Sequence, residues 1–157
     1  MNNTTSLQIL LADDDLDDCL FFKEAVEELA LDVTLTNVYD GEQLMQLLTK
    51  DEGAHNFEPP SYILFLDLNM PRKNGFECLN EIKKHPSLKN LPVVVISTSY
   101  EEEKANQLYK IGAQFYICKP SDFDELKKVI HKAMLLVQQK LQPTKENFLL
   151  NKSNNHF

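Results

Sequence analysis

The sequence predicts an α/β protein with a doubly wound sheet of five parallel strands. Two observations favour this class. Short apolar runs alternate five times with segments of helical periodicity, and most of these runs are continuously apolar, as in strands buried on both faces. Right-handed crossover helices would then cover both faces of the sheet. A length of 157 residues suits one such domain without disulfides or metal staples.

The first half of the chain is predicted to form strand, helix, strand and helix. An apolar run at 7–12 stops at three acids, 13–15, and passes into a helix with one apolar face. Residues 33–36 alternate apolar with polar, as a half-exposed edge strand does. A short helix follows Gly41, and the aperiodic segment 50–61 is predicted to be a surface loop. The inward-facing residues are expected to be Cys19, Phe22, Ala25, Val26 and Leu29, then Leu44, Leu47 and Leu48.

The second half contains three more strands, predicted at 62–66, 91–96 and 115–118. Helices are expected after an Asn74-Gly75 turn, from the acids at 101–103 to Gly112, and from Asp122 onward. Their inward-facing residues are expected to be Phe76, Leu79 and Ile82, then Ala105, Leu108 and Ile111, and finally Phe123, Leu126, Ile130, Ala133 and Val137. This division predicts an N-terminal tail at 1–6, one domain at 7–141 and a polar tail at 142–157, with no output domain.

Composition excludes several classes of protein. A formal charge of −8 and a pI near 5.0 disfavour direct binding to DNA or to an anionic membrane. No early apolar segment is long enough for a signal peptide, and none is long enough to span a bilayer. The cysteines are Cys19, Cys78 and Cys118. They form no C-x-x-C pair, so we expect them to be reduced thiols. These features together predict a cytoplasmic protein.

Polar residues follow four of the predicted strands. Because the carboxyl ends of parallel strands share one edge, where α/β proteins bind ligands, we expect these side chains to meet. Clustered carboxylates raise one another's pKa unless a cation relieves them, and Mg²⁺ prefers such oxygen ligands. A lysine and a hydroxyl beside them suit a phosphoryl group carried on an aspartate. The residues are Asp13 and Asp14, Asp67, Ser97 and Lys119.

Two further features limit this interpretation. Asp67 alone could equally cap the turn that follows it, since Asp is common before Pro-x-x-Asn-Gly. With only four glycines, the chain has no G-x-x-x-x-G-K-S/T or G-x-G-x-x-G loop to bind a nucleotide. The phosphoryl group would therefore come from another molecule.

The ordered set of Asp13-Asp14, Asp67 within Asp-Leu-Asn-Met-Pro, Ser97, Tyr116 and Lys119-Pro120 resembles the receiver domain of two-component response regulators. The resemblance extends over about residues 7–139. The segments 71–75 and 91–99 are similar to those of stand-alone receivers that work with phytochrome-type or other histidine kinases. The resemblance implies a flavodoxin-like fold with strand order 2-1-3-4-5.

The resemblance also implies roles for individual residues. Asp67 would be the phosphoacceptor, and Mg²⁺ would bind Asp14 directly and Asp13 through water. Phosphorylation would move a switch formed by Ser97 and Tyr116, and output would pass by contact to a downstream protein. The partner would be a sensor histidine kinase or a phosphotransfer protein, and the only reactions catalysed would be the domain's own phosphorylation and slow dephosphorylation. Further implied roles are metal ligation by Asp67 and the backbone carbonyl of Asn69, phosphoryl binding by Ser97 and Lys119, and an inward swing of Tyr116.

Alternatives remain open at this point. The chain could be a receiver-like scaffold that is never phosphorylated. It could also be a haloacid-dehalogenase-like phosphatase with Asp13 as nucleophile and Asp15 as general acid, although that leaves Asp67 unexplained. The apolar residues 148–150 in the tail could form an arm that packs on a second copy, giving a homodimer, or belong to a disordered end.

Overall fold

The computed structural model describes residues 7–50 and 62–151. All five strands are parallel and lie in the order β2-β1-β3-β4-β5, which confirms the predicted fold class and order. The predicted loop at 50–61 and the tail at 1–6 lie, apart from Lys50, outside the described residues. In chain order the elements are β1 Leu7–Ala12, α1 Leu16–Glu28, β2 Val33–Val38, α2 Gly41–Thr49, β3 Tyr62–Asp67, α3 Gly75–Lys84, β4 Val93–Ser97, α4 Glu102–Ile111, β5 Phe115–Cys118 and α5 Phe123–Gln138.

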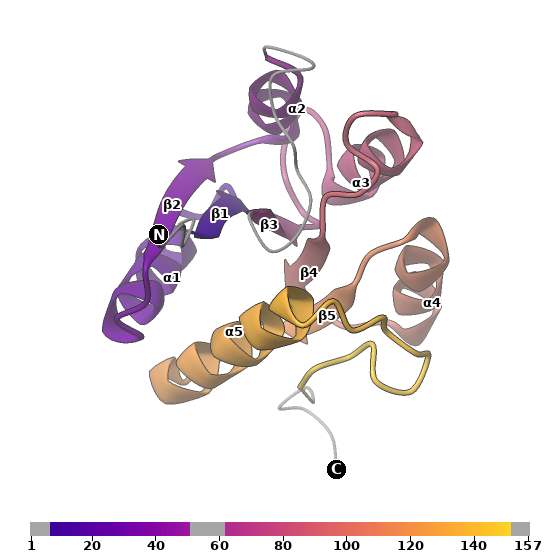
Figure 1. Cartoon of the computed structure of the whole chain (residues 1–157). Helices are drawn as coiled ribbons and strands as arrows, with labels where there is room; N and C mark the ends of the chain where they lie inside the picture. The colour runs from indigo at the N-terminus through magenta and orange to yellow at the C-terminus, as the bar shows by residue number, and fades with distance from the viewer. Residues whose placement is uncertain (1–6, 51–61, 152–157) are drawn as a thin grey trace, which may run out of the picture.

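Two hydrophobic clusters fill the space on either side of the sheet. Alternate strand residues point to opposite faces, so Ile63 and Phe65 of β3 join one cluster and Leu64 and Leu66 join the other. Helices α1 and α5 cover the first face, and α2, α3 and α4 cover the second (Figure 1). The central strands are buried on both sides, whereas β2 alternates between partly buried and exposed residues, as expected for an edge strand.

Polar side chains fix where the helices begin. Asp15, Asp40 and Asp122 each accept a hydrogen bond from a first-turn backbone N–H of α1, α2 and α5. Asn74 does the same for α3, where it forms a capping box with Glu77. The predicted Asn74-Gly75 turn is therefore the start of the helix itself.

Some predicted inward-facing residues lie only at the margin of the core. Leu47 and Phe76 are partly buried, whereas their neighbours Met45 and Cys78 are fully packed. Leu47 and Phe76 still pack against the core, as predicted, and Met45 and Cys78 join the buried faces of the same helices. Leu29, Ile111 and Phe123 also pack at the edge of the core.

The segment after α5 returns to the sheet. Phe148 and Leu150 are buried, and Leu149 forms a parallel bridge with Tyr116 of β5. A disordered end is therefore wrong for residues 143–151, which pack on their own domain. No helix among the described residues is both long and apolar enough to span a membrane.

Candidate functional site

Asp67 is the last residue of β3 and is almost fully buried, with 4% of its surface exposed. Its Oδ1 accepts a hydrogen bond of 3.3 Å from the backbone N–H of Asn69. Gly75 begins α3 directly against this turn, since a Cβ there would lie 2.4 Å from the carbonyl oxygen of Asp67. Glycine at 75 thus allows α3 to pack beside the acid.

Three carboxylates come together at the ends of β1 and β3. Asp13, Asp14 and Asp67 each offer an oxygen within 4.8 Å of the others. Asp13 is 2% exposed, and its Oδ1 accepts a hydrogen bond of 3.0 Å from the N–H of Asp15. Asp14 is exposed. The strand order reverses between β1 and β3, which is where open α/β sheets bind ligands.

The electrostatics of this cluster suit a divalent cation. Burial raises the pKa of Asp67 from 3.8 to about 7; Lys119 opposes the rise and Asp13 adds to it. A second positive charge would relieve this strain, and hard oxygen donors are what Mg²⁺ and similar ions bind. The donor set therefore fits such an ion.

Lys119 follows β5 and reaches across to the acids. Its Nζ lies 2.8 Å from Oδ2 of Asp13 and 2.8 Å from Oδ2 of Asp18, but 3.8 Å from Oδ2 of Asp67. Burial disfavours the charged ammonium, yet hydrogen bonds to Asp13 and Asp18 outweigh this and raise the pKa of Lys119. The sequence contains no signal for the contact with Asp18, because nothing in it aims a first-turn acid of α1 at Lys119.

Ser97 and Tyr116 are linked on the other side of Asp67. Ser97 ends β4 and is fully buried, and its Oγ accepts a hydrogen bond of 3.4 Å from the N–H of Ser99. The Tyr116 hydroxyl donates to the carbonyl oxygen of Ser99 at 2.5 Å. The Tyr116 ring is 1% exposed and meets Tyr100 edge to face at 5.4 Å. The inward position expected after phosphorylation is thus already adopted here.

Burial also raises the pKa of Tyr116 to about 12, while a hydrogen bond with Ser97 opposes the rise. The phenol therefore stays protonated at neutral pH and can donate a hydrogen bond. Asp15, the general acid of the phosphatase alternative, instead caps α1 by accepting from the N–H of Asp18 at 3.1 Å.

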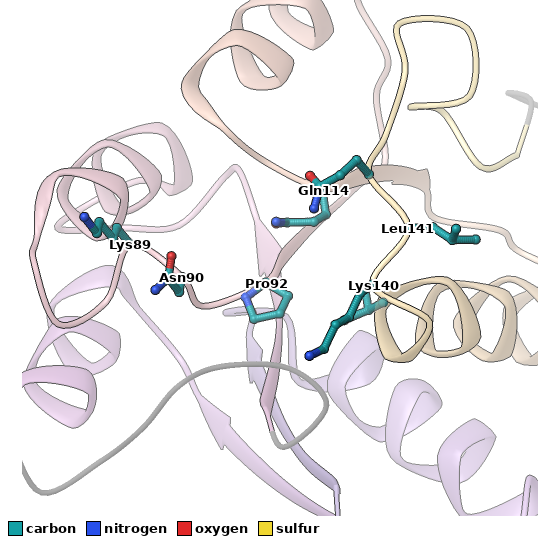
Figure 2. Close-up of a pocket in the computed structure, with 8 residues that line it drawn as sticks. Lys89, Asn90, Pro92, Gln114, Lys140 and Leu141 are labelled. Atoms are coloured by element: carbon teal, nitrogen blue, oxygen red, sulfur yellow. The ribbon is translucent and has the colours of Figure 1, made fainter.

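A separate hollow lies at the opposite edge of the sheet. Figure 2 shows its lining residues around the amino ends of β4 and β5, including Pro92, Gln114 and Lys140. It contains none of the predicted site residues. The predicted site residues lie instead at the carboxyl edge of the sheet.

The fold and site define a flavodoxin-like α/β domain with a cluster of three carboxylates at its switch point that could hold a cation. The sequence profile of the response regulator receiver domain matches residues 9–131. The chain accordingly belongs to the receiver-domain family of two-component signalling.

Individual relatives agree with this assignment. Response regulator Rcp1 of Synechocystis sp. is 34% identical over 122 residues, which cover 78% of this chain and 82% of Rcp1. The probable methanogenesis regulatory protein FilR2 of Methanothrix harundinacea is 30% identical over 122 residues, covering 78% and 77%.

Two solved structures are also similar. The Mn²⁺-bound form of Rcp1 superposes with a TM-score of 0.71 at 30% identity, covering 88% of this chain and 99% of that one. The phosphorylated cyanobacterial phytochrome response regulator RcpA gives a TM-score of 0.74 at 30% identity, covering 89% and 100%.

Proposed function

We propose that Asp67 accepts a phosphoryl group from a histidine kinase or phosphotransfer protein, and that the phosphorylated domain signals by contact with a downstream protein. The observation that carries this proposal is the burial of Asp67 between Asp13, Asp14 and Lys119. A lone turn-capping aspartate would need neither the second and third acids nor the lysine.

Asp14 and Asp67 would hold Mg²⁺ directly, together with the backbone carbonyl of Asn69. Asp13 would act through water, because both of its oxygens already accept hydrogen bonds. When bound, the ion supplies positive charge that neutralises the carboxylates and the incoming phosphoryl oxygens. The Mn²⁺-bound form of the relative Rcp1 supports a divalent site of this kind.

The transfer itself requires an ionised Asp67. A carboxylate oxygen of Asp67 attacks the phosphorus of phosphohistidine; the P–O bond forms as the P–N bond breaks, and the electron pair returns to the imidazole nitrogen. Lys119 lies 3.8 Å from Asp67 and would pair with the transferred group. Ser97 would donate its hydroxyl proton to a phosphoryl oxygen. Positioning and charge neutralisation account for the catalysis.

The partner is proposed to be a phytochrome-type histidine kinase. Support comes from the description of RcpA as a phytochrome response regulator that has been crystallised phosphorylated. Transfer from a purified phytochrome-type kinase should outpace transfer from an unrelated kinase. A cytoplasmic location and a homodimer remain predictions, the second testable by light scattering.

Intact-protein mass spectrometry after incubation with acetyl phosphate and Mg²⁺ tests the acceptor role. Wild type should gain one phosphoryl group, and this gain should disappear in Asp67→Asn and when Mg²⁺ is chelated. Asp17→Asn is a control with the same chemical change, because it removes an exposed acid of α1 that lies outside the metal cluster. It should react as wild type does.

Other outcomes separate the alternatives. If wild type gains no mass and also fails to bind beryllofluoride, the domain is an interaction scaffold. Turnover of small phosphomonoesters that survives Asp67→Asn would favour the phosphatase.

A further inference from the structure

Residues 147–151 occupy the free edge of β5. The N–H of Tyr116 donates to the carbonyl oxygen of Phe148 at 2.9 Å, and the N–H of Leu150 donates to the carbonyl oxygen of Tyr116 at 2.9 Å. The Asn151 side chain does the same for Cys118, accepting from its N–H at 2.9 Å and donating to its carbonyl oxygen at 2.7 Å. The segment thus satisfies every outward backbone group from Tyr116 to Cys118.

Apolar contacts reinforce this pairing. Phe148 is 4% exposed, and its ring meets Tyr109 at 5.5 Å and Tyr116 at 6.3 Å, both edge to face. Leu150 is also buried, and its carbonyl oxygen accepts a weak hydrogen bond from Lys132 at 3.4 Å. The segment is therefore a packed part of the domain and covers the Tyr116 ring.

Two hydrogen-bonded routes lead from this segment to the site. The first route passes through Tyr116. Its hydroxyl donates a hydrogen bond to the carbonyl oxygen of Ser99, and the N–H of Ser99 donates to the hydroxyl oxygen of Ser97. The second route passes through Cys118, which the segment binds through Asn151. The next residue is Lys119, and the backbone N–H of Lys119 donates to the carbonyl oxygen of Ser97 at 2.8 Å. Both routes end at the groups proposed to bind the phosphoryl group.

We propose that residues 147–151, docked on β5 of their own domain, position Ser97 and Lys119 for the phosphoryl group, so that docking of the segment and loading of Asp67 favour each other. The sign follows from Tyr116: the docked segment covers its ring in the inward position that is expected after phosphorylation, so docking favours the state that holds the phosphoryl group. Because coupling between two sites is reciprocal, loading must also tighten docking. This inference rests on the proposed function, since it needs a phosphoryl site at Asp67.

The affinity for beryllofluoride, a phosphoryl mimic, measured by calorimetry with Mg²⁺ tests the inference. Asn151→Ala removes both hydrogen bonds to Cys118 at the margin of the domain, and we expect it to weaken binding about fivefold to tenfold. Phe148→Ala should weaken it similarly. Glu146→Gln changes the exposed residue just before the segment and should leave the affinity unchanged.

Amide hydrogen exchange tests the reciprocal effect. The N–H groups of Tyr116 and Leu150 both lie in the docked pairing. In wild type, saturating beryllofluoride should slow their exchange by at least the factor by which Asn151→Ala weakens binding. A thermal melt of Asn151→Ala shows that the domain is folded under the assay conditions.

Each remaining outcome overturns a defined claim. Equal or tighter binding by Asn151→Ala, with Asp67→Asn alone failing to bind, overturns the coupling and leaves the proposed function intact. Failure of wild type to bind overturns both. A dimer in light scattering that Asn151→Ala converts to a monomer would assign the contact to a second copy and overturn docking within one domain.

Discussion

On the α1 side of Asp67, three charged residues are held by ion pairs; on the α4 side, aromatic rings are held by burial. The first set, the charged flank, consists of Asp13, Asp18 and Lys119, joined by two contacts of 2.8 Å. The second set, the aromatic flank, consists of Tyr100, Tyr116 and Phe148, stacked edge to face. Ion pairs respond to charge, salt and pH, whereas packed rings respond to loss of volume. The two flanks should therefore fail under different perturbations.

Lys119→Met gives the largest expected effect, on the charged flank. It leaves buried Asp13 without its cation, so the free energy of unfolding of the metal-free protein should fall by about 4 kcal/mol at neutral pH. Urea titration measures the loss. Lys128→Met is the control, because that lysine is 76% exposed and its removal should change stability by less than about 0.5 kcal/mol. Similar losses in both variants would contradict the special role of the buried pair.

Phe148→Ala breaks the aromatic flank. The lost packing should lower the free energy of unfolding by about 2 to 3 kcal/mol, because the ring is 4% exposed but lies where the chain end can partly collapse. This loss should be the same at low and high salt in urea titrations, because the packed rings carry no charge. A strong salt dependence would show that the flank depends on charge after all.

The pH dependence of stability sharpens the contrast. Since the pKa of Asp67 is about 7 in the folded chain against 3.8 ordinarily, the folded state binds more protons between these values. Stability of the metal-free protein should therefore fall as pH rises from about 4 to about 7, with a slope from this group of up to about 1.4 kcal/mol per pH unit. Urea titrations of wild type and Asp67→Asn measure this contribution, which the variant should lack. Equal slopes would contradict the raised pKa.

Asp18→Asn gives the smallest expected effect. The Nζ of Lys119 lies nearer to the Asp18 carboxylate than to the Asp67 carboxylate. Removing the charge of Asp18 should therefore free the ammonium for an anion bound at Asp67. Affinity for beryllofluoride should rise about twofold to threefold, a modest gain because the Asp18 carboxylate is 38% exposed. Asp17→Asn makes the same charge change without this contact and should have a smaller effect. An equal rise in beryllofluoride affinity in both variants would show that Asp18 acts only through its charge and not through its contact with Lys119.

The charged flank was largely predictable from sequence, and the aromatic flank was not. Apolar runs that stop at Asp13 and Asp67 locate strand ends, and parallel strands bring such ends to one edge. The contact of Asp18 with Lys119, 101 positions apart, depends on a side-chain rotamer that periodicity does not encode. The apolar residues 148–150 are too few to show a period, and their docking depends on the open edge of β5 beside Tyr109 and Tyr116.

The two outer strands of the sheet protect their edges by different means. An unpaired strand edge is a template for association with other chains. On β2, the exposed threonines Thr34 and Thr36 alternate with partly buried apolar residues, so this edge strand is short and polar. On β5, the chain's own residues 147–151 take the place that a foreign strand would occupy. Loss of this cover would leave an apolar, hydrogen-bonding edge open to aggregation, so the segment also contributes to the solubility of the domain.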